Sequence, residues 1–234
     1  MASQQKSRSD SVTETHEVGS MRFFGLERIG ALSDGVVAIA ITLLVLELKV
    51  PDIVVTHSVL EHELMGQVPE LIAWVISFFV IAMIWYDQHF LFAHMERCDS
   101  GFIATNMIQL GGVSLIPVAA HLIGRFPEDI ISAVVFSFIM SVNGLLMTIN
   151  AWYLSQHDAL HSHMGARFLY RRAIYHTSSF IVIASIATAI AFAGQPLLGQ
   201  LVWIALPLTF MTYHSAYNRY LEKHAVPKPL NEES

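Results

Sequence analysis

Charged residues are clumped along this chain, and the stretches between the clumps are long and apolar. A helix rises about 1.5 Å per residue, so about 20 apolar residues cross the hydrocarbon core of a bilayer. A soluble bundle would instead alternate polar and apolar faces. The pattern therefore predicts an all-α polytopic membrane protein. Stretches without any Asp, Glu, Lys or Arg are residues 71–86, 100–124, 130–157 and 173–218.

Six membrane-spanning helices are expected from these stretches and from the turn residues between them. Pro117 should kink the third helix, because proline lacks the N–H that the helix needs. The tripeptide Gly194-Gln195-Pro196 should make a tight turn that divides the longest uncharged run into two helices. Valines and leucines in the loop 50–68 also permit a short amphipathic helix there. The expected spans are residues 26–49, 69–94, 99–123, 128–155, 166–193 and 197–222.

Composition sharpens this picture. Hydrophobic residues make up 54% of the chain and charged residues 14%, whereas a soluble domain carries about 25% charged residues. Residues 1–20 are polar and lack the apolar core of a secretory signal, so they are predicted to be a disordered tail. Residues 21–222 should form the transmembrane domain, and residues 223–234 a polar C-terminal tail. The single cysteine, Cys98, excludes an internal disulfide, and the net charge of −6 argues against nucleic-acid binding.

The distribution of Lys and Arg predicts the orientation. With six spans both termini lie on one side, and that side holds all of the 13 Lys and Arg except Lys49 and Arg125. Because positive residues accumulate in cytoplasmic loops, both termini are expected in the cytoplasm. The protein is accordingly expected in the cell membrane, in contact with the lipid bilayer.

One face of the first span combines a glycine, a hydroxyl and two aliphatic side chains. Gly35, Ile39, Thr42 and Leu46 follow one another at spacings of four, three and four residues, which places them on one helical stripe. If several copies of this helix surround an axis, Ile39 would form a hydrophobic constriction that can gate by dewetting, and Thr42 a ring of hydroxyl oxygens. Ordinary helix packing is the alternative, with Thr42 bonded to the carbonyl of Ala38.

Polar side chains of the first three helices fall at similar depths, in the third of the membrane nearest the termini. Ionisable groups in a span usually face a partner or a cavity rather than lipid. These residues could therefore form a polar network that holds the three helices together, or they could be unrelated residues of the membrane interface. The residues are Arg28, Ser33, Asp34, Trp85, His89 and Asn106.

The same residues resemble the signature of prokaryotic relatives of transmembrane protein 175, an endolysosomal potassium channel. The resemblance covers mainly residues 28–51 and 85–117, and Leu32 stands where the family pattern usually has Phe. The matching positions are Arg28, Ser33-Asp34-Gly35, the run from Ala38 to Leu44, the run from Leu46 to Pro51, Trp85, His89, Asp99 and Asn106.

This resemblance implies a six-helix subunit that forms a homotetramer with the first helix lining a central pore. Carried over by position, Ile39 would be the constriction, Thr42 the hydroxyl layer tied to potassium preference, and Leu46 a further apolar layer. The leading hypothesis is passive K⁺ conduction of modest selectivity, with K⁺ as permeant ion and no cofactor or organic substrate. A proton-conducting channel and a secondary transporter are the alternatives.

Histidines raise a second class of function. The cluster His157-x3-His161-x-His163, with Asp158, has residue types that bind metals, and His121, His176 and His214 could be considered as haem ligands. No H-E-x-x-H motif or Ser/His/Asp order accompanies them. We therefore expect no metal site and no enzymatic activity.

Overall fold

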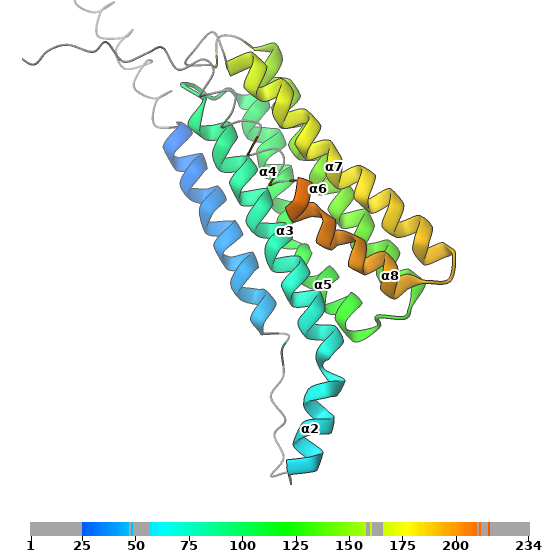
Figure 1. The fold of residues 1–234 in the computed structure, drawn as a ribbon. Helices are drawn as coiled ribbons and strands as arrows, with labels where there is room; N and C mark the ends of the chain where they lie inside the picture. Colours follow the sequence, from blue (N-terminus) through cyan, green and yellow to red (C-terminus); the bar gives the residue numbers. More distant parts are fainter. Residues whose placement is uncertain are drawn as a thin grey trace, which may run out of the picture.

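Apolar helices run side by side in a computed structural model of the chain, which describes residues 25–46, 48, 57–157, 160, 166–209, 211 and 215 (Figure 1). Five of the helices in this part of the chain are long and apolar enough to cross a membrane. The all-helical membrane fold that the sequence predicts is therefore confirmed. The five spans are Gly25–Val45 (the first helix), α3 (Val68–Ala93), Ser100–Arg125, α6 (Ile130–Gln156) and residues Ala173–Phe192 of α7 (Ala166–Phe192).

The third span is broken near Pro117, as the sequence predicts. It consists of α4 (Ser100–Ser114) and α5 (Ile116–Arg125), which meet at Leu115, and Pro117 lies in the first turn of α5. Proline is tolerated in that position because the first N–H groups of a helix have no intrahelical acceptor.

Side-chain caps begin two of the long helices. Asp99 accepts a hydrogen bond from the N–H of Phe102 at the start of α4 (2.9 Å), and Asp129 accepts one from the N–H of Ile131 at the start of α6 (2.7 Å). Such caps satisfy N–H groups that would otherwise be exposed at the helix end. Gly194, with a φ of +86°, makes the turn that ends α7, since this backbone conformation suits glycine.

The last expected span is described only in its first part. It comprises α8 (Pro196–Leu201), a 3-10 turn η2 (Val202–Ile204) and a continuation to Thr209, and this apolar helix is shorter than a full span. Most of residues 210–222 lie outside the described residues, as do the two predicted tails, 1–20 and 223–234. A sixth span therefore stays a prediction.

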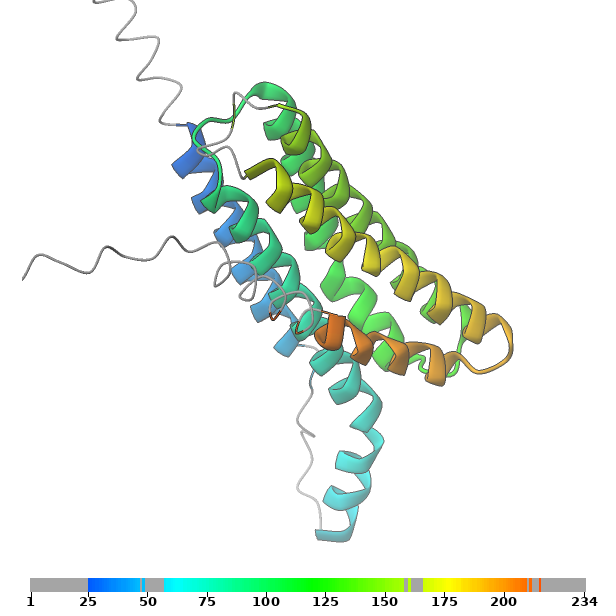
Figure 2. The ribbon, with the colours of Figure 1, turned by 45° about the horizontal axis from the view of Figure 1, so that its top comes forward.

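The short helix in the loop after the first span is present as α2 (His57–Gly66). It projects from one end of the bundle, as an extension below α3 (Figures 1 and 2). In the bundle itself, α6 packs along α7, α3 along α5, and α4 along α6. The first helix and α7 lie on opposite sides of the bundle in both views.

Buried apolar side chains fill the space between these helices. The larger core cluster joins the first helix to the other spans through Val37, Ala40 and Leu44. A second cluster, around Phe102 and Tyr170, lies at the end of the bundle where the loop before Asp99 joins α3 to α4, and it includes residues of α6 and α7. The first helix is thus one outer element of the bundle, and only one of its faces contributes to the core.

Candidate functional site

The first helix divides sharply into a buried and an exposed face. Its buried residues are Ile29, Ser33, Val37, Ala40 and Leu44, which recur every three or four positions. This spacing places them on one stripe along the helix. The stripe faces the rest of the subunit, and its single polar member is Ser33.

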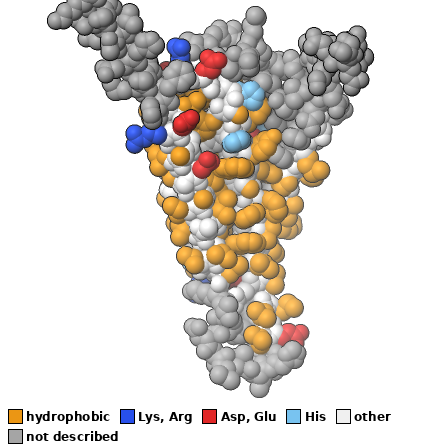
Figure 3. Space-filling model, turned by 90° about the vertical axis from the view of Figure 1, so that its left-hand side faces the viewer, with side chains coloured by type: hydrophobic (Ala, Val, Ile, Leu, Met, Phe, Trp, Pro, Cys, Tyr) orange, Lys and Arg blue, Asp and Glu red, His pale blue; other side chains and the backbone are white. Residues whose placement is uncertain are grey.

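The stripe of Gly35, Ile39, Thr42 and Leu46 lies on the other side of the helix. At 100° per residue its centre is roughly 150° from the centre of the buried stripe. All four residues are exposed in the single subunit, with 61% of Ile39 and 69% of Leu46 accessible. Figure 3 shows this side of the molecule as mostly apolar, with charged residues and histidines gathered mainly at one end. The stripe therefore packs only in small part against the described residues of its own subunit.

The hydroxyl of Thr42 donates a hydrogen bond to the carbonyl of Ile39 (2.9 Å). The acceptor lies three residues back and is not the carbonyl of Ala38. This bond fixes the hydroxyl proton toward the helix backbone. The lone pairs of Thr42 Oγ1 are then free to accept from, or coordinate, a group beyond the helix surface.

Two polar contacts tie the first helix to α3 and α4. The indole of Trp85 donates to a carboxylate oxygen of Asp34 (2.8 Å). The amide of Asn106 donates to Ser33 Oγ (3.1 Å), and Ser33 in turn donates to the carbonyl of Ile29 (2.9 Å). Both Ser33 and Asn106 are almost fully buried. An interhelical hydrogen bond in apolar surroundings fixes rotation and register of the helix that makes it.

Gln88 is a member of this group that sequence reasoning missed. Its amide donates to Asn106 Oδ1 (2.8 Å), so that Ser33, Asn106 and Gln88 form one chain of hydrogen bonds. The available signal was its place directly before His89, in a polar segment near the end of an apolar helix. Depth alone could not reveal it, because the contact depends on how α3 is rotated against α4.

His89 and Arg28 stand differently from the rest. The ring of His89 is stacked on the indole of Trp85, with 5.4 Å between ring centroids. Arg28 is exposed, and among the described residues no hydrogen bond or ion pair joins it to Asp34 or to Asn106. The structure thus brings together Ser33, Asp34 and Asn106 with α3, and leaves Arg28 at the surface of the subunit.

Comparison with known proteins identifies the family. The family model described as "Endosomal/lysosomal potassium channel TMEM175" matches residues 28–117. A potassium channel of Streptomyces collinus is 30% identical over 213 residues, which cover 88% of this chain and 95% of the relative. The chain belongs to the TMEM175 family. The relatives in this family are ion channels and not enzymes. This chain, with its several apolar helices, is a multi-pass membrane protein of the TMEM175 family.

Other TMEM175 relatives differ in their names and lengths. A potassium channel of Chamaesiphon minutus is 37% identical over 116 residues, 48% of this chain and 57% of the relative. The human endosomal/lysosomal proton channel TMEM175 is 28% identical over 205 residues, which cover 79% of this chain and 40% of that protein.

Solved structures share the fold. The crystal structure of a lysosomal potassium-selective channel TMEM175 homolog from Chamaesiphon minutus superposes with a TM-score of 0.67 at 24% identity, covering 80% of this chain and 97% of that one. The potassium channel MtTMEM175, solved as its T38A variant with a nanobody fusion, superposes with a TM-score of 0.55 at 19% identity, covering 84% and 93%. These superpositions confirm the helical TMEM175 fold.

A cleft of about 430 Å³ opens beside the polar contacts of this TMEM175 chain. Its walls come from the first helix and from the end of α3. Two carboxylates, Glu27 and Asp34, and the imidazole of His89 contribute to its lining. Acidic clefts raise the local concentration of cations.

The remaining histidines do not form a metal centre in the part of the chain that the structure describes, where no group of three or more His, Cys, Asp or Glu is suitably placed. His157 bonds the carbonyl of Tyr153 (2.8 Å) and stacks on its ring. Its expected companions Asp158, His161 and His163 lie outside the described residues, as does His214. His176 is hydrogen-bonded to Asp87.

Proposed function

We propose that the chain is a potassium-preferring cation channel, in which four copies place the first helix around a central pore. The observation that supports this most strongly is the exposed stripe of Gly35, Ile39, Thr42 and Leu46. It faces away from its own subunit, while the opposite face of the same helix is buried and hydrogen-bonded. A homotetramer that turns this stripe inward gives it a function that lipid contact alone does not.

In this arrangement the narrowest layer is a ring of Ile39 side chains. A ring of aliphatic groups offers no ligand to a cation. An ion therefore passes the ring only after it has lost part of its hydration shell. Thr42 lies about one turn further along and supplies oxygen lone pairs that can replace lost water, because its proton is directed to the Ile39 carbonyl. Leu46 forms a second apolar layer beyond Thr42. Gly35 lies about one turn before Ile39 and, having no side chain, leaves space there. Selectivity for K⁺ over Na⁺ should be modest, since no tight carbonyl-lined site is formed.

The polar contacts behind the stripe hold the pore helix at a fixed rotation. Trp85–Asp34 and Gln88–Asn106–Ser33 act on the side opposite Ile39. Arg28 and His89, which are exposed in the single subunit, would lie where neighbouring subunits meet. The acidic cleft at this end would concentrate cations near the pore entrance.

Proton conduction is the second candidate. The observation in its favour is that the animal relatives are named proton channels, the human protein among them. A channel of the cell membrane with six spans and both termini in the cytoplasm fits either permeant ion, so the ion has to be measured directly.

The test is a recording of reversal potentials in planar bilayers, under opposing K⁺ and Na⁺ gradients, with the purified protein. Ile39→Ala should widen the ring and lower the K⁺/Na⁺ permeability ratio toward that of free diffusion. Ile186→Ala is the matched control: the same side chain is shortened on an exposed face of α7, across the bundle from the first helix.

A control with the wild-type ratio and an altered Ile39→Ala ratio would support the proposal. Equal ratios in all three proteins would remove Ile39 from the constriction. A reversal potential that follows the proton gradient alone would replace K⁺ by H⁺ as the permeant ion. The absence of cation current from wild-type protein would contradict the proposed function altogether.

A further inference from the structure

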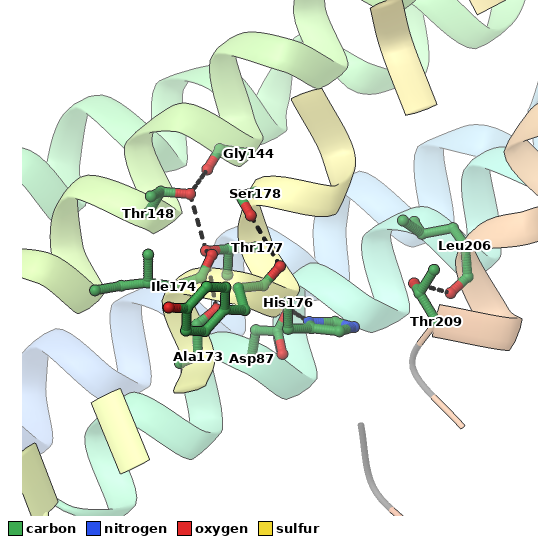
Figure 4. Close-up of polar contacts among 11 residues, drawn as sticks. Asp87, Gly144, Thr148, Ala173, Ile174, His176, Thr177, Ser178, Leu206 and Thr209 are labelled. Carbon is green, nitrogen blue, oxygen red and sulfur yellow. Dashed lines mark hydrogen bonds and ion pairs between the residues drawn. The ribbon is translucent and has the colours of Figure 1, made fainter. Parts of the chain in front are cut away.

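An aspartate and a histidine, far apart in the sequence, meet inside the subunit. Asp87 of α3 and His176 of α7 are 4% and 5% exposed, and the His176 Nδ1 atom is 2.9 Å from Asp87 Oδ2 (Figure 4). Both residues belong to apolar helices of spanning length. The pair is separate from the exposed stripe of the first helix and takes no part in the pore proposed above.

A carboxylate beside a neutral imidazole carries one negative charge. The Asp87–His176 pair is therefore electrically neutral only when it holds one further proton. Loss of that proton leaves a single buried anion, and gain of another leaves a single buried cation. An unpaired charge in apolar surroundings is strongly unfavourable, whereas the neutral pair is tolerated. The charge of the contact is therefore balanced in only one of these protonation states.

The partner helix α7 is firmly fixed to α6 at this level. Thr177, the residue after His176, shares a hydrogen bond with Thr148 of α6 (2.9 Å), and Thr148 donates to the carbonyl of Gly144 (2.7 Å). Figure 4 shows these contacts beside the Asp87–His176 pair. Gly144 allows Phe180 of α7 to approach so closely that a Cβ atom there would overlap it. When the protonation of the Asp87–His176 pair changes, α3 is therefore the helix that can shift or rotate.

One short segment of α3 carries contacts in three directions. Trp85 reaches Asp34 on the first helix, Gln88 reaches Asn106 on α4, and Asp87 reaches His176 on α7. Asp87 lies about 200° around the helix from Trp85, so these two contacts act on opposite sides of α3. A shift or rotation of α3 at Asp87 is thereby passed to the side chains that hold the first helix.

We propose that Asp87 and His176 form a proton-dependent contact that positions α3 and thereby sets the open probability of the channel. The proposal rests on the channel function stated above and adds a regulatory input to it. Asp87 and His176 are positioning residues, since neither touches the permeant ion.

Few other titratable groups face the pair within the described residues, and His176 is the group whose charge acts on Asp87. On α3, His89 lies on the opposite face against Trp85, and His94 bonds the carbonyl of Phe90 (2.8 Å). On α7, Tyr170 packs its ring against His94. Tyr86 directly precedes Asp87 on α3. The remaining titratable residues of the neighbouring elements lie on the far face of α3, at the opposite end of the bundle, beside the loops or on exposed faces: Glu27, Arg28, Asp34, Glu70, Glu96, Arg97, Cys98, Asp99, His121, Arg125, Glu128, Asp129, Tyr153, His157, Arg171 and Tyr175.

The experiment records single-channel open probability and the K⁺/Na⁺ permeability ratio of the full chain between about pH 5 and about pH 9. In the wild type, the open–closed equilibrium should change by up to about tenfold per pH unit over part of this range, at a constant permeability ratio. The double variant Asp87→Asn/His176→Asn keeps a hydrogen bond but cannot titrate, and its open probability should not depend on pH. His62→Asn is the matched control, an exposed histidine replaced on α2 outside the bundle, and should keep the wild-type pH profile.

A wild-type channel that conducts cations with a flat pH profile would overturn this inference and leave the channel function standing. Retention of the wild-type profile by the double variant, or loss of it in His62→Asn, would overturn it as well. If the double variant does not assemble, His176→Gln replaces it, and a wild-type profile there has the same meaning. Absence of cation current at every pH would remove both the channel function and this inference.

Discussion

Asn106 makes the clearest prediction about what holds the first helix in place. Its side chain accepts from the Gln88 amide and donates to the Ser33 hydroxyl, and it is 1% exposed. Asn106→Leu keeps the shape and removes both bonds. Ser33 retains its bond to the Ile29 carbonyl, whereas the buried Gln88 amide loses its acceptor, Asn106 Oδ1.

The magnitude follows from these contacts. Interhelical hydrogen bonds in membranes contribute about 0.6 kcal/mol each on average, so two of them give about 1 kcal/mol. An unsatisfied buried amide adds about 1–3 kcal/mol. We expect Asn106→Leu to destabilise the folded subunit by about 2–4 kcal/mol, equivalent to roughly 30- to 1000-fold in the folding equilibrium. Thermal unfolding in detergent should show a lower midpoint, and bilayer recordings should show an altered open probability.

Asn143 offers a matched control, because it is an equally buried amide on α6. Its side-chain N–H₂ donates to the carbonyl of Ile139 in the same helix (2.9 Å), and its Oδ1 atom has no hydrogen-bond partner in the described part of the chain. Asn143→Leu breaks no bond between helices and should change stability by less than about 1 kcal/mol. Equal destabilisation by the two substitutions would refute the assignment of Asn106 as a link between helices.

Two further predictions concern stability away from the first helix. Gly144→Ala should destabilise the protein by about 1–3 kcal/mol in thermal unfolding, because the new Cβ atom overlaps Phe180, while Gly111→Ala, with open space around it, should be neutral or slightly stabilising. Asp99 is an N-cap. Desolvation raises the pKa of its carboxyl, but hydrogen bonds, led by the one from Tyr153, lower it overall, so the contribution is present at neutral pH and disappears as the pH falls below the ordinary value of 3.8. Asp99→Ala should therefore cost about 1 kcal/mol at neutral pH and progressively less in acid; a difference from wild type that stays constant with pH would contradict this sign.

The spans could be predicted from the sequence because the bilayer imposes a simple rule. Backbone groups in hydrocarbon must bond within a helix, so apolar stretches of the right length become helices whatever their neighbours are. The breaks between helices could be predicted for a similar reason. Pro117 and Gly194 act through local backbone chemistry, and helices end beside both residues in the structure. The end of the last helix depends on residues that the structure describes only in part.

Partners across helices were harder to predict than the helices. Ser33, Asp34 and Asn106 stood out as polar residues in apolar segments, but their bonds depend on the rotation of α3, which hydropathy does not encode. Gln88 and the pairing of Asp87 with His176, 89 residues later, were therefore not foreseen. The expected participation of Arg28 follows from depth alone, and its side chain is exposed in the single subunit.

The weak packing of the first helix explains why a few hydrogen bonds matter so much in this subunit. Only 28% of its most apolar stretch is buried in the subunit, against 39–50% for the other four spans. Little apolar contact therefore opposes its rotation. In the proposed pore the width of the opening would depend directly on that rotation, since a turn of the helix would move Ile39 toward or away from the axis. Under the proposed function, the bonds made by Trp85 and Asn106 would act on conduction without any contact to the ion, and the proposed change at Asp87 would reach the pore through them.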